Sequence, residues 1–260
     1  MEVLYMNGAG NDFMVIDARD LQADLQALAL KLCPITGADG FLALDHSDIA
    51  DFKLHFYNAD GLRGEMCGNG ARCICKFAYD HGLCGENITV ETDAGLVYGW
   101  HLGENQYRVQ LNNPGILDLH RKEDVAYVEL GDPGIPHSIK EIPGLSWEQA
   151  PELFDEARAL RYDPAFPKGS NITFYTRLDD TTVRVLTYER GVEDYTLACG
   201  TGCASVASVL WSKGQLPGGR LIAYNRGGTL TISLEAENGK IRKLMLEGPA
   251  ELAGVYNYEF

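Results

Sequence analysis

The sequence has no apolar run near the roughly 20 residues that a transmembrane helix requires. Residues 1–12 run straight into polar, glycine-rich sequence and lack the pattern of a signal peptide. Basic residues are scarce, with 22 Lys and Arg against 37 Asp and Glu and a net charge of −15. Nucleic-acid binding needs clustered basic residues. We therefore expect a cytoplasmic protein with neither a membrane nor a nucleic-acid partner.

Cysteines are few, seven in 260 residues, and odd in number. A secreted disulfide framework is usually denser and even, so reduced thiols are the better interpretation. Cys67, Cys73 and Cys75 cluster, but their spacing is not that of a zinc site, and the last two point to different sides of a helix. Neither a Walker A motif nor G-x-G-x-x-G occurs, and no feature of a pyridoxal-phosphate enzyme can be identified. We expect no metal and no cofactor.

What the sequence does contain is an internal repeat. Cys67-Gly68-Asn69-Gly70 opens an apolar helical segment that stops at Gly82, and Cys199-Gly200-Thr201-Gly202 opens a second one that stops at Gly214. The spacing from cysteine to terminal glycine is the same in both copies, which lie about half the chain apart. Both segments are apolar on most sides, which predicts buried helices with the two glycines at their left-handed ends.

The flanks of the two segments repeat as well. β-rich runs precede the helices at 52–58 and 183–189, and hairpins follow at 88–100 and 221–234, with a further tight turn at Asn238-Gly239. Outside this plan, amphipathic helices are expected at 21–32, ended by Pro34, and at 147–161, after a Ser146/Gln149 capping box. The prediction is an α+β fold made by duplication: two pseudo-symmetric domains, each a mixed or antiparallel β-sheet wrapped around a central buried helix.

A cysteine at a helix N-terminus is suited to acid–base chemistry. The unpaired amides and partial positive charge there stabilise a thiolate and also bind an anion such as a carboxylate. Two such helix starts could place one thiolate and one thiol on opposite faces of a carbon and so invert its configuration. A lone Cys-Gly-x-Gly is more often structural, and Cys33, Cys73, Cys75, Cys84 and Cys203 are interpreted in that way. The matched repeat favours Cys67 and Cys199 as a catalytic pair.

Several ordered motifs along the chain resemble the diaminopimelate epimerase family. These are Asn7-Gly8-Ala9-Gly10-Asn11-Asp12-Phe13, Asn58-Ala59-Asp60-Gly61, Cys67 to Arg72, Pro136-His137, Asn171-Ile172, Glu189-Arg190-Gly191, Cys199 to Gly202, and Gly248-Pro249-Ala250. The resemblance implies a cofactor-independent isomerase that interconverts LL- and meso-diaminopimelate, in lysine and peptidoglycan precursor biosynthesis. It also implies that the last strand returns to the first domain. The expected domains are residues 1–111 plus 249–260, and residues 112–248.

The family's site residues map onto this sequence. The resemblance implies that Cys67 and Cys199 are the two bases, and that His137 and Glu189 lie near the thiols and tune them. It assigns substrate binding to the following set: Asn11, Asn58, Gly68, Asn69, Asn171, Glu189, Arg190, Gly200 and Thr201. Within this set the amides of the two helix starts would hold the reacting carboxylate, and the forked guanidinium of Arg190 suits a distal one.

One departure leaves alternatives open. Many family members have Gly-Asn-Pro-His where this chain has Gly134-Ile135-Pro136-His137, and isoleucine cannot hydrogen-bond through its side chain. Racemisation of another amino acid, such as histidine, is therefore the second hypothesis. A ligand-binding protein that has lost catalysis is the third, and the presence of both cysteines counts against it. The sequence is compatible with a homodimer but does not determine the oligomeric state.

Overall fold

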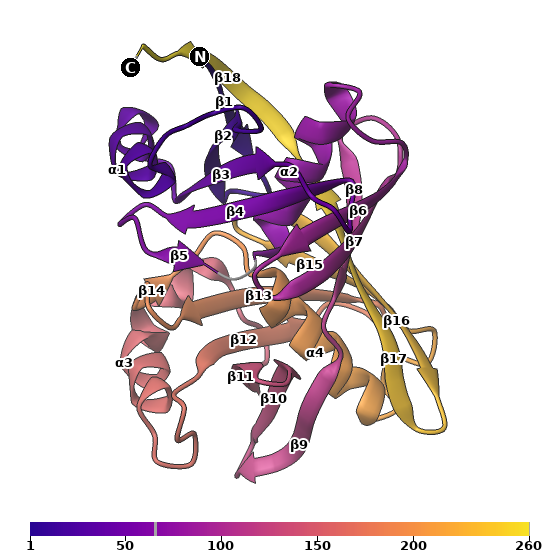
Figure 1. The fold of residues 1–260 in the computed structure, drawn as a ribbon. Helices are drawn as coiled ribbons and strands as arrows, with labels where there is room; N and C mark the ends of the chain where they lie inside the picture. Colours follow the sequence, from indigo (N-terminus) through magenta and orange to yellow (C-terminus); the bar gives the residue numbers. More distant parts are fainter. Residues whose placement is uncertain (65–66, 260) are drawn as a thin grey trace. The chain divides into compact units, whose positions relative to one another are not determined.

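The structure is a computed structural model that describes residues 1–64 and 67–259. The chain divides into two compact units, Met1–Gln110 with Glu247–Phe260, and Leu111–Leu246. Each unit combines a mixed β-sheet with two α-helices, which confirms the α+β prediction (Figure 1). Among the described residues, no helix has both the length and the apolarity needed to cross a membrane.

The first unit is built on an eight-stranded sheet. Its strand order is β18, β1, β2, β3, β4, β6, β7, β8, in which β2–β3 and β4–β6 are parallel and the other pairs are antiparallel. The strands are β1 (Glu2–Asn7), β2 (Asp12–Asp17), β3 (Gly40–Asp45), β4 (Phe52–Asn58), β6 (Asn87–Thr92), β7 (Gly95–His101), β8 (Gln106–Leu111) and β18 (Glu251–Asn257), with the short β5 (Arg63–Gly64) beside β4. The last strand of the chain thus pairs with the first.

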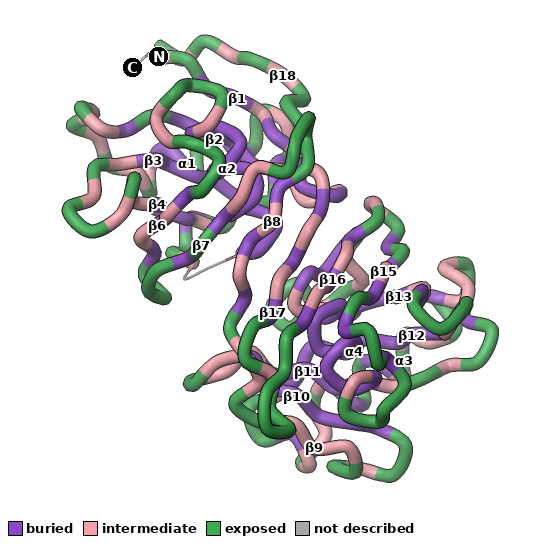
Figure 2. The backbone as a smooth tube through the Cα atoms, turned by 90° about the vertical axis from the view of Figure 1, so that its right-hand side faces the viewer, coloured by how far each residue is buried: buried purple, intermediate pink, exposed green. Residues whose placement is uncertain are grey.

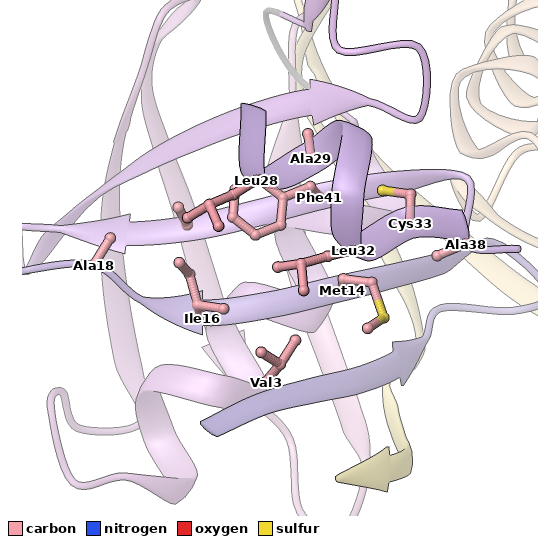
Figure 3. Close-up of a cluster of buried hydrophobic side chains, with 11 residues drawn as sticks. Val3, Met14, Ile16, Ala18, Leu28, Ala29, Leu32, Cys33, Ala38 and Phe41 are labelled. Carbon is pink, nitrogen blue, oxygen red and sulfur yellow. The ribbon is translucent and has the colours of Figure 1, made fainter. Parts of the chain in front are cut away.

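Two helices cover opposite faces of this sheet, α1 (Leu25–Thr36) and α2 (Gly68–Asp80). Met14 of β2 and Phe41 of β3 belong to the apolar cluster under α1 (Figure 3). Their chain neighbours Phe13 and Leu42 point the other way, toward Gly70 of α2. Because side chains alternate along a strand, both faces of β2 and β3 are buried.

The second unit repeats this plan. Its strand order is β9, β10, β11, β12, β13, β15, β16, in which β11–β12 and β13–β15 are parallel and the other pairs are antiparallel. The strands are β9 (Pro114–Lys122), β10 (Val125–Gly131), β11 (Gly134–Glu141), β12 (Asn171–Arg177), β13 (Thr182–Glu189), β15 (Arg220–Asn225) and β16 (Gly228–Glu237), with the short β14 (Asp194–Tyr195) beside β13. A final strand, β17 (Lys240–Pro249), follows β16 through the Asn238-Gly239 turn.

The two units share their connectivity. In the first, α1 links the parallel strands β2 and β3, and β5 with α2 lies between the parallel strands β4 and β6. In the second, the short helix η1 (Trp147–Gln149) with α3 (Ala150–Arg161) links β11 to β12, and β14 with α4 (Gly200–Ser212) lies between β13 and β15. The same order of elements and the same strand directions confirm the duplication that the sequence indicated.

Helices α2 and α4 begin at the predicted cysteines and are buried along most of their length (Figure 2). Both end in the same hydrogen-bonded motif. Gly82 adopts a φ of 67° and donates to the carbonyl of Tyr79, and Gly214 adopts a φ of 70° and donates to that of Trp211. The next residue along the chain reaches back to the carbonyl of Ala78 and of Leu210, respectively. These are Schellman ends, which require a residue that tolerates positive φ, so the prediction for both glycines is confirmed.

The boundaries expected for the first amphipathic helix were wrong. The helix begins at Leu25, because the side chain of Asp24 accepts a hydrogen bond from the Ala27 amide and caps it. It also continues past Pro34 to Thr36 and ends at Gly37, which has a φ of 76°. Pro34 lies in the last turn, where its missing N–H costs a single hydrogen bond. The Ser146/Gln149 capping box, by contrast, is present as predicted.

Candidate active site

The candidate site residues of the first unit lie at the start of α2. Cys67 is the N-cap residue, with extended backbone (φ −132°, ψ 122°), and its carbonyl accepts from the Ala71 amide at 2.7 Å. Gly68 and Asn69, predicted to hold a carboxylate, form the first turn and are buried, whereas Cys67 is half-buried. The first amides of an α-helix have no acceptor within the helix and carry a partial positive charge. This helix start has the chemistry of an anion site next to a thiol.

Asn11 is brought to Cys67 by the turn between β1 and β2. The thiol of Cys67 donates to Asn11 Oδ1 at 3.5 Å, and Asn69 Nδ2 lies 3.5 Å from the same oxygen. The turn is tight, since Ala9 and Gly10 have φ values of 65° and 87°. A Cβ on Gly8 would meet the Asn69 carbonyl oxygen at 2.9 Å, so only glycine allows this approach to the helix.

A fully buried arginine, Arg72, fixes the same region. Its guanidinium donates to the carbonyl oxygens of Gly8 (3.3 Å), Gly68 (3.4 Å) and Pro249 (3.2 Å). These carbonyls belong to the turn before β2, to the start of α2 and to the end of β17. Arg72 ends the Cys67 to Arg72 motif that resembles the family, but its sequence position gave no signal for this role, because two of its three partners are remote in the chain.

Asp39 and Asn58 lie at the same end of the sheet as Asn11. Gly40 pairs with Phe13 on one side and with Asn58 on the other. The strand ends that carry Asn11, Asp39 and Asn58 therefore lie side by side across β2, β3 and β4. Asp39 Oδ2 accepts from Asn11 Nδ2 at 2.6 Å and from the Asp12 amide at 3.0 Å. Asn58 is exposed at the end of β4. Asp39 lies outside the motifs that predicted the other site residues.

The candidate site residues of the second unit lie at the start of α4. Cys199 is its N-cap residue and is buried, and its sulfur accepts from the Gly202 amide at 3.4 Å. A Cβ on Gly202 would meet Thr173 Oγ1 at 2.7 Å, so glycine is required for the helix to pack on the sheet. Gly200 and Thr201 supply the first amides of the helix, as in the first unit.

The hydroxyl of Thr201 joins Cys199 to His137. Thr201 Oγ1 lies 3.5 Å from Cys199 Sγ and 3.0 Å from His137 Nε2. His137 is fully buried in β11, and its Nδ1 has no hydrogen-bond partner within the described chain. The loss of hydration on burial, with a smaller contribution from the charge of Arg190, lowers the pKa of His137 to about 3, so the ring is neutral. The sequence predicted a role for the amide of Thr201 but not for its side chain.

The remaining predicted residues of this unit lie on adjacent strands. His137 pairs with Asn171 in the parallel β11–β12 register. Asn171 Nδ2 donates to the Pro136 carbonyl at 3.0 Å, and its Oδ1 accepts from the Arg190 amide at 2.8 Å. Asn171 is therefore held on both sides and itself holds the start of the turn after β13.

Glu189 and Arg190 stand at the end of β13. Glu189 Oε1 accepts from the hydroxyl of Thr196 at 2.6 Å. The Arg190 side chain is exposed, and its Nη1 donates to the Lys168 carbonyl at 3.0 Å. In the second unit the structure thus places His137, Asn171, Glu189 and Arg190 at the same end of three neighbouring strands.

The surroundings of Cys199 favour its protonated form. Burial raises the pKa of the thiol well above its usual value, and the charge of Glu189 raises it further. The hydrogen bonds from Thr201 and Gly202 act in the opposite direction and lower it, but by less. The other cysteines that the sequence analysis took as structural include Cys73 and Cys75, which are fully buried in α2. Burial raises the pKa of Cys73 to about 12.

No group of three or more His, Cys, Asp or Glu in residues 1–64 and 67–259 is arranged to hold a metal ion. Each unit has a cysteine at a helix start: Cys67 lies beside side-chain amides and Cys199 beside a hydroxyl that contacts an imidazole. The chemistry that such groups support is proton transfer and the binding of carboxylates.

Solved structures define the class of fold. A phenazine biosynthesis protein of the PhzF family from Bacillus anthracis aligns with a TM-score of 0.73 at 15% identity, covering 100% of this chain and 99% of that chain. A hydroxyproline epimerase from Agrobacterium vitis aligns with a TM-score of 0.73 at 16% identity, covering 98% and 90%. At these identities the likeness concerns the fold alone, an α+β fold that this chain shares with both proteins.

Sequence comparison then gives the family. The sequence model of diaminopimelate epimerase matches residues 3–114 and 131–253. The diaminopimelate epimerase of Aquifex aeolicus is 35% identical, over 95% of this chain and 94% of that protein. The one from Flavobacterium psychrophilum is 34% identical over 96% and 97%. The chain belongs to the diaminopimelate epimerase family. The alternative of a racemase for another amino acid is not favoured by these relatives.

Proposed function

We propose that the protein interconverts LL- and meso-diaminopimelate by proton transfer at one α-carbon, with Cys67 and Cys199 as the two acid–base groups. The observation that carries the proposal is the recurrence of one arrangement in both units. Each has a cysteine as N-cap of a buried helix that begins with glycine, with polar residues at the same end of the adjoining strands. Membership of the family supplies the substrate.

The reaction needs a base and an acid on opposite faces of the reacting carbon. One sulfur removes the α-proton as a thiolate while the other delivers a proton as a thiol, and the two exchange roles in reverse. The amides of Gly68 and Asn69, and of Gly200 and Thr201, hold the α-carboxylate and stabilise the negative charge that develops on it. In this mechanism no cofactor takes up the negative charge. The helix amides stabilise that charge on the substrate carboxylate by hydrogen bonding.

The environment of Cys199 indicates which of the two cysteines acts first as the acid. Burial and the charge of Glu189 favour its thiol form, so Cys199 is the acid in the protein that is ready for substrate. The Gly202 amide and the Thr201 hydroxyl then stabilise the thiolate that forms after the proton is delivered. Neutral His137 holds the Thr201 hydroxyl at 3.0 Å.

The distal end of the substrate is assigned to Arg190, Asn58 and Asn171. Asn58 lies at the same end of the first sheet as Asn11, and Asn171 lies at the same end of the second sheet as Arg190. The Arg190 fork suits a carboxylate, and the backbone of this residue is held by Asn171. Ile135 lies half-buried at the start of β11, two residues before His137. Where many family members have asparagine, Ile135 offers no hydrogen bond from its side chain. Arg190 supplies the charge that recognises the distal carboxylate. We further propose a cytoplasmic location and a homodimer.

The test is incubation with LL-diaminopimelate in deuterated water, with wild-type protein and the Cys67→Ser and Cys199→Ser variants. The expected result is formation of the meso isomer with solvent deuterium at the inverted carbon, and its loss in both variants. Absence of isomerisation by the wild type under reducing conditions would refute the assigned activity. Isomerisation that survives in either variant would refute the two-thiol mechanism alone.

A further inference from the structure

The side chain of Asn11 lies between a carboxylate and the Cys67 thiol. Its Nδ2 donates to Asp39 Oδ2 at 2.6 Å, and its Oδ1 accepts from Cys67 Sγ at 3.5 Å. Asp39 Oδ2 is itself fixed by the Asp12 amide at 3.0 Å. Asp39 precedes β3 and Cys67 precedes α2, so these three side chains come from three separate parts of the first unit.

The orientation of the Asn11 amide follows from the chemistry of its neighbours. A carboxylate can only accept hydrogen bonds, so the amide nitrogen must face Asp39 and the oxygen must face the other way. There it meets two donors, the Cys67 thiol and the Asn69 side-chain amide. A thiolate has no proton to donate and would face the partial negative charge of this oxygen. A hydrogen bond made only by the neutral form favours that form.

We propose that Asp39 is a positioning residue, which holds the Asn11 oxygen toward Cys67 and so favours the protonated form of the Cys67 sulfur over its thiolate. Its place in the reaction rests on the proposed epimerase function. Among the described residues, Cys73 on α2 is a titratable group that interacts with this thiol, and Asp12 and Arg72 interact in turn with Cys73. Asp39 differs from them because it acts through Asn11.

The test measures the Cys67 thiol directly, in protein without substrate. Iodoacetamide modification of the Cys67 peptide is followed by mass spectrometry across pH, and the midpoint gives the apparent pKa of that thiol. In Asp39→Asn the new amide can donate to Asn11 Oδ1, so the Asn11 amide is free to turn its N–H toward the sulfur. We expect the midpoint to fall by on the order of half a pH unit.

Loss of the Asp39 charge by itself would also lower the midpoint, so the same substitution is made in an Asn11→Ala background. If Asp39 acts through Asn11, most of the shift disappears there. Measurement at about 1 M salt gives a second separation, because salt screens a through-space charge effect at an exposed group but does not reorient an amide. Asp60→Asn, which removes an exposed carboxylate that holds the Leu62 amide in the turn after β4, is the matched control.

An equal shift with and without Asn11, or a shift that vanishes at high salt, would overturn the proposal in favour of simple charge. No shift, or an upward shift, would overturn it entirely. The measurement uses no substrate, so its outcome is independent of the assay with LL-diaminopimelate. A protein that fails to isomerise diaminopimelate would refute the proposed function and leave the thiol result standing.

Discussion

Replacement of Arg72 by methionine tests whether the site is held together by this buried cation. Methionine has a similar length and no donor, so the carbonyls of Gly8, Gly68 and Pro249 lose their guanidinium partner. Arg72 joins all three segments through one side chain. We therefore expect loss of stability in the first unit.

The size of the loss follows from the three bonds. Hydrogen bonds to charged groups contribute roughly 1.5–3 kcal/mol each, and donor–acceptor distances of 3.2–3.4 Å place these at the weak end of that range. Bonds made by one side chain are not independent, so their sum is an upper bound. The expected decrease in the free energy of unfolding is about 3–4 kcal/mol, below the roughly 4.5 kcal/mol that three bonds at the weak end would give together.

Urea unfolding gives the midpoint, and hydrogen exchange of the α2 peptide reports the first unit separately from the second. Lys76→Met is the control: Lys76 lies one helical turn further along α2 and pairs with Asp80 at 2.8 Å. Asp80 is 45% exposed, so this pair should contribute under about 1 kcal/mol. If Arg72→Met costs no more than Lys76→Met, Arg72 does not anchor the site.

Four further predictions concern catalysis and pH. Cys199→Ser should abolish epimerisation at neutral pH because a hydroxyl is a far weaker acid than a thiol, whereas Cys73→Ser should retain most activity in the same coupled assay; comparable losses would contradict the assignment. Thr201→Val should lower kcat more than it changes KM, since the hydroxyl contacts Cys199 and His137, and initial-rate kinetics would show the split. Arg190→Lys keeps the charge but loses the fork, so KM for diaminopimelate should rise by roughly 10-fold or more, and an unchanged KM would remove Arg190 from the distal site. Because folding lowers the pKa of His137 to about 3, the unfolded chain binds a proton there below about pH 6.5 while the folded chain does not. Stability should therefore fall as pH is lowered from about 6.5 toward 3, and His137→Asn should flatten this part of the unfolding profile.

Local patterns were sufficient for much of the fold. The start of each buried helix at Cys67 and Cys199, its end at Gly82 and Gly214, and the capping box at Ser146 all depend on residues within a few positions of one another. Side-chain periodicity and turn residues placed the strands and hairpins for the same reason. The first amphipathic helix was misplaced because Leu21 continued the apolar spacing, whereas the Asp24 cap set the actual start.

The sequence by itself also determined the duplication, the position of Cys67 and Cys199 at two matched helix starts, and the family. Each of these depends on short motifs of neighbouring residues. Only the tertiary structure decided what surrounds each thiol. Arg72 reaches Pro249 across 177 positions, His137 reaches Thr201 across 64, and Asn11 reaches Asp39 across 28. Such contacts carry no spacing rule, because they depend on which strand ends the sheet brings together. Burial, which makes His137 neutral and keeps Cys199 protonated, is likewise a property of the packed chain and of no residue alone.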